Sequence, residues 1–127
     1  MIKLLFLTAG GAIGTLSRYA VSGLAHTLFG SDFPYGTLSV NLLGSFTVGL
    51  LWGLFESESL SPASRSFVFI GFLGGFTTFS TYSLETLNLL RDGQVKVALM
   101  NILLHNFLGL VLVFGGFVLA RVLRHGN

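Results

Sequence analysis

Residues 97–120 read VALMNILLHNFLGLVLVFGGFVLA, and these 24 residues contain no Asp, Glu, Lys or Arg. About 20 helical residues are enough to cross the hydrocarbon core of a membrane, which is about 30 Å thick. Residues 33–55 and 66–84 form two further uncharged intervals of 23 and 19 residues. Residues 4–31 form a fourth interval, interrupted by Arg18 alone. The sequence therefore predicts an all-α membrane protein with four transmembrane helices.

The overall composition excludes most water-soluble classes. Hydrophobic residues make up 52% of the 127 residues and charged residues only 9%, against about 25% charged in an average soluble domain. The lack of cysteine excludes disulfide scaffolds, iron–sulfur clusters and thiolate zinc sites. The net charge of +2 comes from basic residues that stand singly and form no patch, so we expect no binding to nucleic acid.

The intervals predict one transmembrane domain, residues 1–127, with short connectors. The expected helices cover about 3–29, 36–55, 65–90 and 95–124, and the expected connectors are 30–34, 56–62 and 91–94. These connectors have the Gly, Pro, Ser and Asp content of turns and helix caps. Ser61 followed by Pro62 predicts a helix N-cap and first helical residue. The first interval also has the outline of a cleaved signal peptide, but its apolar residues continue past Arg18, so we expect it to remain as a span.

Basic residues are nearly balanced between the two sides of the predicted bundle. One side carries Lys3, Arg65, Arg121 and Arg124. The other carries Arg91 and Lys96, and also Arg18 if it snorkels that way. Because a clear excess of Lys and Arg is what fixes orientation, two interpretations stay open. Either a weak bias still suffices, or the chain inserts both ways up and pairs with an inverted copy of itself.

Small residues four positions apart recur in the apolar intervals, and such pairs let membrane helices approach closely. They are Gly10 and Gly14, then Ser45, Gly49 and Gly53, then Gly71 and Gly75. We therefore expect the chain to form an oligomer.

Polar side chains at membrane depth are costly and mark candidate functional residues. Arg18 either snorkels to the interface or stands at the base of a vestibule that attracts anions. Thr37, Asn41 and Ser45 recur every four residues and form a polar stripe on the second span. Asn41 either joins helices or offers its amide N–H groups to a passing anion.

The third interval ends in residues 74–85, GGFTTFSTYSLE, which is a poor sequence for a regular helix. We expect the third helix to be broken near its centre within this stretch, which begins with Gly74-Gly75. Carbonyl groups released there must face protein, a wet cavity or an ion. Three aromatic residues lie beside this break, Phe76, Phe79 and Tyr82, and together they favour a functional cluster over ordinary packing. On the fourth span, Asn101 and His105 share a face, and a lone histidine there is more often a hydrogen-bonded packing residue than a metal ligand.

Catalytic patterns are absent from the sequence. It contains no Ser-x-x-Lys, His-Glu-x-x-His or Gly-x-Ser-x-Gly motif. Glu85 is the single carboxylate near a span, so chemistry by a pair of acids has no second partner at that depth. We expect the protein not to be an enzyme.

Residues 74–85 resemble the signature of the Fluc family of small fluoride channels. The resemblance extends to residues 36–42, GTLSVNL, and to the first span from Gly10-Gly11 through Arg18-Tyr19. It implies a dual-topology homodimer of antiparallel subunits with two pores in the cytoplasmic membrane. Such a protein exports fluoride passively and lowers its concentration inside the cell.

The resemblance also implies roles for individual residues. A structural sodium ion would be held by the main-chain carbonyls of Gly74 and Thr77 from both subunits. The pore and anion-binding residues would be Asn41 as the lining amide, Phe79 and Tyr82 as the phenylalanine box, Ser80 and Thr81 as hydroxyls by the break, Arg18 in the vestibule, Glu85 at the end of the third helix, and His105 at the level of an aromatic residue on the fourth helix.

Two positions depart from the family pattern. The second box residue is usually Phe and here is Tyr82, whose hydroxyl either donates to fluoride or simply reaches water. Because the usual Phe has no hydroxyl, the sequence alone favours an active Tyr82→Phe variant. Gly109 and Val113 stand about where relatives often carry a track of hydroxyls, which puts that track in doubt.

Two other functions compete with this one. A small multidrug transporter is similar in size and topology but needs a carboxylate in its first span, where this chain has Arg18. A helix bundle that assembles without transporting would not explain the polar break in the third span.

Overall fold

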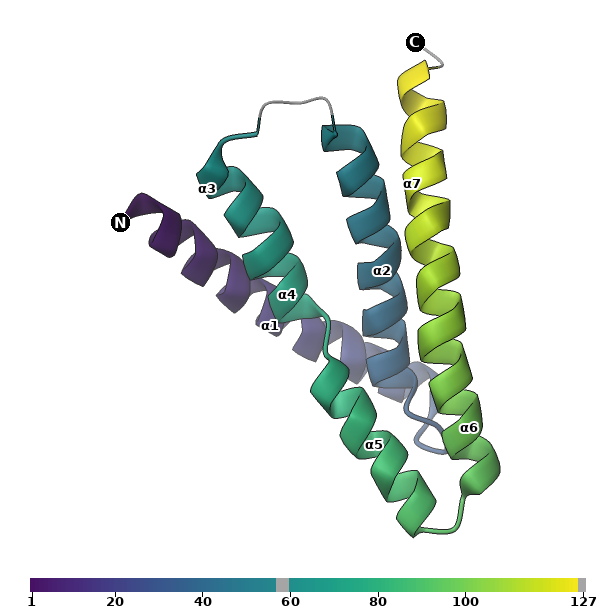
Figure 1. Cartoon of the computed structure of the whole chain (residues 1–127). Helices are drawn as coiled ribbons and strands as arrows, with labels where there is room; N and C mark the ends of the chain where they lie inside the picture. Colours follow the sequence, from purple (N-terminus) through teal and green to yellow (C-terminus); the bar gives the residue numbers. More distant parts are fainter. Residues whose placement is uncertain (57–59, 126–127) are drawn as a thin grey trace.

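The computed structural model describes residues 1–56 and 60–125, and every regular element in these ranges is helical. Four helical segments are long and apolar enough to cross a membrane: Ile2–Phe29, Tyr35–Phe55, Pro62–Arg91 and Val95–His125. The prediction of an all-α protein with four apolar helices is confirmed. Figure 1 shows the C-terminus and the start of α3 toward one end of the bundle, and the turn between α5 and α6 at the other.

The first two spans are the uninterrupted helices α1 (Ile2–Phe29) and α2 (Tyr35–Phe55). At the end of α1, Gly30 adopts a φ of 83°, a conformation that a residue without a side chain enters at little cost. The expected connector 56–62 lies partly outside the described residues, because residues 57–59 are not among them.

The third span consists of α3 (Pro62–Arg65), the π-helical η1 (Ser66–Phe72), α4 (Leu73–Phe76) and α5 (Phe79–Arg91). Its start confirms the sequence prediction, since Ser61 Oγ accepts the Ser64 N–H at 3.1 Å and Pro62 is the first helical residue. Thr77 and Thr78, between α4 and α5, have extended backbones with ψ of 157° and 113°.

The glycine pair that begins the predicted stretch is itself helical. Gly74 and Gly75 both lie within α4, and the extended residues follow them. The physical reason is a close helix crossing: a Cβ at Gly75 would lie 2.7 Å from the Gly11 carbonyl oxygen on α1. Gly75 is therefore needed for packing, and the chain leaves the helix only after it.

The fourth span consists of α6 (Val95–Leu103), the π-helical η2 (Leu104–Leu108) and α7 (Gly109–His125). Figure 1 shows α7 running beside α2 along much of its length. Gly49 on α2 faces the backbone of Val113, and Gly116 on α7 faces the backbone of Phe46. Bringing backbones this close replaces side-chain bulk with extensive van der Waals contact, which is how apolar helices associate in lipid.

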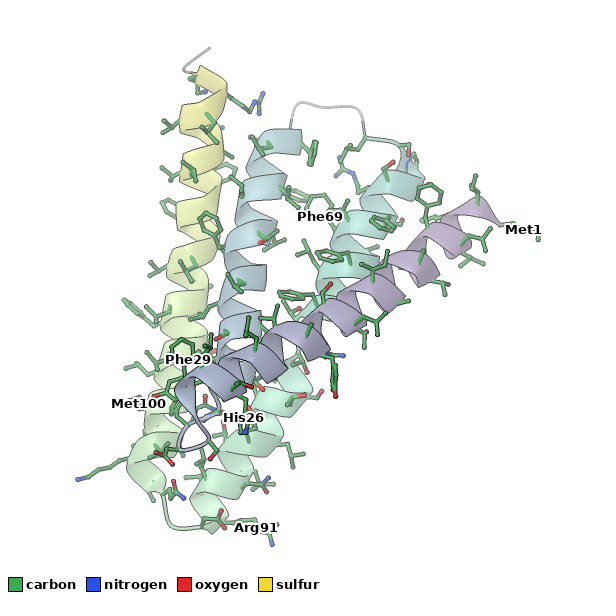
Figure 2. The ribbon with its side chains drawn as sticks, turned by 180° about the vertical axis from the view of Figure 1, so that it is seen from behind. Met1, His26, Phe29, Phe69, Arg91 and Met100 are labelled. Atoms are coloured by element: carbon green, nitrogen blue, oxygen red, sulfur yellow. The ribbon has the colours of Figure 1, made fainter. Side chains whose placement is uncertain are left out.

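Helix α1 crosses the other helices obliquely, as Figure 2 shows from behind, with Met1 in one half of the molecule and Arg91 in the other. Gly10 and Gly14 of α1 lie against the backbone of Phe67–Phe76 in the third span. The small residues that suggested an oligomer are thus used inside a single chain, and they give no independent support for a second copy.

Much of the molecular surface is apolar. In the most apolar windows of the four spans, only 11% to 28% of residues are buried within the chain. Near one end of the bundle, the guanidinium carbon of Arg65 lies 5.8 Å from the ring centre of Trp52. An amphipathic aromatic beside a cation at the end of a span is typical of the membrane–water interface. The chain is a multi-pass membrane protein.

Candidate functional site

The side-chain amide of Asn41, on α2, pairs with the main chain of Thr78 in the third span. Asn41 Nδ2 donates to the Thr78 carbonyl oxygen at 2.9 Å, and the Thr78 N–H donates to Asn41 Oδ1 at 2.8 Å. These two bonds satisfy the backbone N–H and C=O of a residue that has left the helix, which lipid cannot do. Asn41 therefore joins two spans, and its second N–H is left to donate elsewhere.

Carbonyl groups at the break lose their helical partners, and those of Gly74 and Thr77 are among them. In a regular helix, the Gly74 carbonyl would accept the Thr78 N–H and the Thr77 carbonyl would accept the Thr81 N–H. Here the Thr78 N–H donates to Asn41 Oδ1, and the Thr81 N–H donates to Thr78 Oγ1 at 3.3 Å, where Thr78 caps α5. The carbonyl oxygens of Gly74 and Thr77 are thereby released from the helical hydrogen-bond ladder.

A cavity of about 910 Å³ is lined mainly by α1, α2 and α5, together with the turn between α1 and α2. Its lining includes Arg18, Thr37, Thr78, Thr81 and Glu85. Thr37 Oγ1 donates to Glu85 Oε1 at 2.6 Å, which ties α2 to α5 across this cavity. Glu85 Oε2 is buried and has no hydrogen-bond partner among the described residues. Arg18, predicted either for the interface or for a vestibule, lies on the wall of this cavity.

A second cavity of about 390 Å³ borders the break. Most of its polar and aromatic lining was predicted from the sequence: Asn41, Ser45, Gly74, Thr77, Phe79, Tyr82 and His105. Thr78 lines both cavities, and its hydrogen-bond partner Asn41 lines the smaller one.

The aromatic side chains separate at the break. The ring centres of Phe79 and Tyr82 lie 5.3 Å apart, and Tyr82 lies 4.4 Å from the His105 ring. Phe76 instead stacks on Phe72 at 6.0 Å and lines neither cavity. The expectation that all three aromatics form one functional cluster is therefore wrong for Phe76, because the extended residues rotate α5 relative to α4.

The two hydroxyl residues predicted by the break are placed differently. Thr81 lines the larger cavity and accepts a hydrogen bond from Thr78 Oγ1 at 2.9 Å, so its own proton is free to donate. Ser80 is exposed and lines neither of these two cavities.

His105 is half-buried on η2, and its Nδ1–H donates to the Asn101 carbonyl oxygen at 3.0 Å. Asn101 is fully buried, and its Nδ2 donates to Thr86 Oγ1 at 2.9 Å. This network fixes α6 against α5 and holds the His105 ring against Tyr82.

Among the described residues, no group of three or more His, Cys, Asp or Glu side chains could hold a metal ion.

Two functional residues were not predicted from the sequence: Thr78, which is hydrogen-bonded to Asn41, and Asn106. Asn106 Nδ2 donates to the Tyr82 hydroxyl oxygen at 3.1 Å and lines the smaller cavity. The signal for Asn106 was present, because it is a second polar residue directly after His105 in an otherwise apolar span. Its contact with Tyr82 depends on the packing of α5 against the fourth span and could not be read from spacing.

The two cavities together offer hydrogen-bond donors and ring edges in the middle of a membrane protein. The donors are an amide N–H, hydroxyl groups and a guanidinium group, and the rings of Phe79 and Tyr82 carry positive edges. A small, strongly hydrated anion needs such groups to replace its water. The arrangement is suited to holding an anion briefly rather than to making or breaking bonds.

Comparison with known proteins matches residues 5–117 to the family described as CrcB-like protein, Camphor Resistance (CrcB). The chain is 46% identical over 121 residues to a protein of Parabacteroides distasonis named fluoride-specific ion channel FluC, covering 95% of this chain and 94% of that protein. A protein of the same name from Maridesulfovibrio salexigens is 44% identical over 124 residues, 97% of this chain and 98% of its own length. Another from Salinibacter ruber is 50% identical over 113 residues, 89% and 85% of the two chains.

Proposed function

Because this chain belongs to the CrcB/FluC family, whose named relatives are fluoride-specific ion channels, we propose that it is itself a fluoride-specific channel. The observation that carries the proposal is the similarity to FluC proteins over nearly the whole length of both chains. It is a transport protein and not an enzyme. Fluoride moves through it down its own gradient, so that a cell that has accumulated fluoride loses it.

The two cavities support a path for the ion. Fluoride enters the larger cavity past Arg18, whose charge raises the local anion concentration without binding the ion in mid-path. It then passes the free N–H of Asn41 beside Thr78 and enters the smaller cavity. There the edges of Phe79 and Tyr82 stabilise it. Contacts that are each weak let the ion leave quickly, and rapid release is required for conduction.

An inverted second copy would complete this path. Phe79 is 75% exposed in the single chain, and Ser80 and Gly74 beside it are exposed as well, all within a membrane span. Irregular backbone at membrane depth is tolerated only where protein or water covers it. Because the basic residues are nearly balanced between the two sides, a copy in the opposite orientation is the partner that we propose.

A sodium ion between the two copies fits the groups at the break. The released carbonyl oxygens of Gly74 and Thr77 are hard, uncharged ligands of the kind that a small monovalent cation takes. A Cβ built at Gly74 would meet nothing within 4 Å, so the single chain leaves open space beside it. The bound cation would satisfy carbonyl groups that lipid cannot, and it would hold the two copies together.

Purified protein in liposomes loaded with fluoride, or with chloride as the control, tests the proposed function. With the membrane potential clamped by a potassium ionophore, we expect fast fluoride efflux and little chloride efflux. Efflux of both anions at equal rates would contradict selectivity. Efflux of neither anion, with drug cations transported instead, would support the multidrug alternative.

A further inference from the structure

The amide group of Asn106 makes two contacts through a single nitrogen atom. Its Nδ2 donates to the Ile102 carbonyl oxygen at 2.8 Å and to the Tyr82 hydroxyl oxygen at 3.1 Å. A main-chain carbonyl can only accept, so the atom facing Ile102 must be the nitrogen and not the amide oxygen. The Ile102 contact therefore fixes the orientation of the amide, and both of its N–H groups are committed as donors.

The direction of the second bond decides what the Tyr82 hydroxyl can do. Because it accepts from Asn106, its own proton is not used in that bond and points elsewhere. Among the described residues, no hydrogen bond donated by the Tyr82 hydroxyl is found. The Tyr82 side chain is 8% exposed and lines the smaller cavity together with Asn106, Asn41 and Thr77.

The fourth span supplies no hydroxyl to this cavity from its next two turns. Val113 packs against Gly49 of α2, Gly109 is buried, and neither residue is part of the cavity lining. Tyr82 thus carries a buried hydroxyl on one of the two paired rings themselves.

We propose that the Tyr82 hydroxyl is a selectivity-determining hydrogen-bond donor for the permeating anion, and that Asn106 is the positioning residue that turns its proton toward the cavity. This inference rests on the proposed function, and it reverses the expectation from sequence that Tyr82→Phe stays fully active. Fluoride accepts stronger hydrogen bonds than chloride does, so a neutral donor here favours fluoride without holding it as a fixed cation would.

A double-mutant cycle on fluoride and chloride efflux from liposomes tests the pair. Tyr82→Phe removes the donor and keeps the ring, so we expect fluoride efflux to fall about tenfold, the size of one hydrogen bond to a charged group. We expect the ratio of fluoride to chloride efflux to fall with it. Asn106→Ala should lower fluoride efflux in the parent. It should have little further effect in the Tyr82→Phe background, because that variant has no hydroxyl for Asn106 to orient.

Two further variants sharpen the test. Asn106→Asp places an acceptor beside the hydroxyl and draws its proton away from the cavity, so we expect a loss at least as large as that of Asn106→Ala. Ser83→Ala removes the next hydroxyl on the same helix, which already donates to the Phe79 carbonyl oxygen and lines neither cavity, and it should leave efflux unchanged.

The outcomes separate the inference from the proposed function. Parent-like efflux and selectivity in Tyr82→Phe would overturn the inference while the fluoride channel stands. Equal losses from Asn106→Ala in both backgrounds would show that Asn106 acts on the fold and not through Tyr82, which also overturns it. A parent protein that conducts no fluoride would instead contradict the function itself.

Discussion

Asn41 and Thr78, 37 residues apart in the sequence, are joined by two hydrogen bonds, at 2.9 and 2.8 Å, between one side-chain amide and the backbone C=O and N–H of one residue. The pattern is the one that two neighbouring β-strands form, reduced to a single residue on each side. At this one residue, the Asn41 side chain supplies the backbone hydrogen bonds that a regular helix supplies elsewhere. This one side chain holds the Thr78 N–H, which in a regular helix would bond the Gly74 carbonyl.

The Asn41→Asp variant should destabilise the protein and reduce fluoride efflux. The aspartate has the same shape and still accepts the Thr78 N–H, but it places a second oxygen against the Thr78 carbonyl. Losing one buried bond and leaving its partner unsatisfied costs about 1–3 kcal/mol. The unfolding midpoint in detergent measures this. Asn88→Asp, at an exposed position of α5, is the matched control for stability alone, because Asn88 lines the larger cavity. Equal midpoints for the two variants would contradict the role of the pair.

The Phe79→Ile variant should keep its fold and lose most fluoride efflux. Isoleucine retains bulk but has no ring edge to stabilise an anion. Because Phe79 is 75% exposed in the single chain, the substitution disturbs little internal packing. Phe114→Ile is the matched control, since Phe114 is 69% exposed on α7 and lines neither cavity. Parent-like conduction by Phe79→Ile would show that the aromatic-edge mechanism is wrong for this chain.

The Gly74→Val variant should weaken the dimer and its sodium site. Within one chain, a Cβ at either Gly74 or Gly115 on α7 meets nothing within 4 Å. Gly115→Val is therefore the matched control, and loss of the dimer in Gly74→Val alone would point to what covers Gly74 in the assembly. Size-exclusion chromatography in mild detergent measures the dimer, and Thr77→Ser should be mild because the proposed ligand is main-chain. A dimeric Gly74→Val protein with an ordinary water at the site in a high-resolution map would refute both proposals.

Neighbouring glycines on α7 should respond in opposite ways to the same substitution. A Cβ at Gly116 would collide with the backbone of Phe46 and Leu50 on α2, whereas a Cβ at Gly115 meets nothing. Overpacking typically costs about 1–3 kcal/mol, so Gly116→Ala should lower the unfolding midpoint. Gly115→Ala should leave it unchanged or raise it, because alanine favours a helix by up to about 1 kcal/mol over glycine. Equal effects of the two substitutions would mean that α2 and α7 do not pack this closely.

Reporter fusions to the C-terminus should give both cytoplasmic and exterior signals. The near balance of Lys and Arg between the two ends of the bundle provides little to fix one orientation. A phosphatase active outside and a fluorescent protein active inside report the two populations in the same cells. One orientation alone would rule out pairing with an inverted copy of the same chain.

The four spans could be predicted because membrane helices are specified by length and by the absence of charge. The start of the third span was predicted for a similar local reason, since Ser61 and Pro62 act on their own helix end. The π-helical stretches at Ser66–Phe72 and Leu104–Leu108 could not be predicted. Their altered hydrogen bonding depends on how each span fits its neighbours, and the sequence of one span does not contain that information.

The sequence predicted which residue types make up the candidate site, but not the hydrogen bonds that join them. Polar residues at membrane depth stand out in any apolar interval, which is how Asn41, Tyr82 and Glu85 were found. The exact point of the break was missed because glycine weakens a helix locally, while the decisive partner of Thr78 lies on another helix. Asn106 was missed for the same reason, since its role depends on a contact with a residue 24 positions earlier.

The pairing of Asn41 with Thr78 also bears on the order in which the chain is made. A third span that entered the membrane alone would carry unpaired peptide groups into hydrocarbon, each costing several kcal/mol. The residue that satisfies them precedes Thr78 by 37 positions, so it leaves the ribosome first. The second span can thus receive the third as it enters the bilayer. A version of the protein rearranged to synthesise the third span before the second would lack that partner at the moment of insertion.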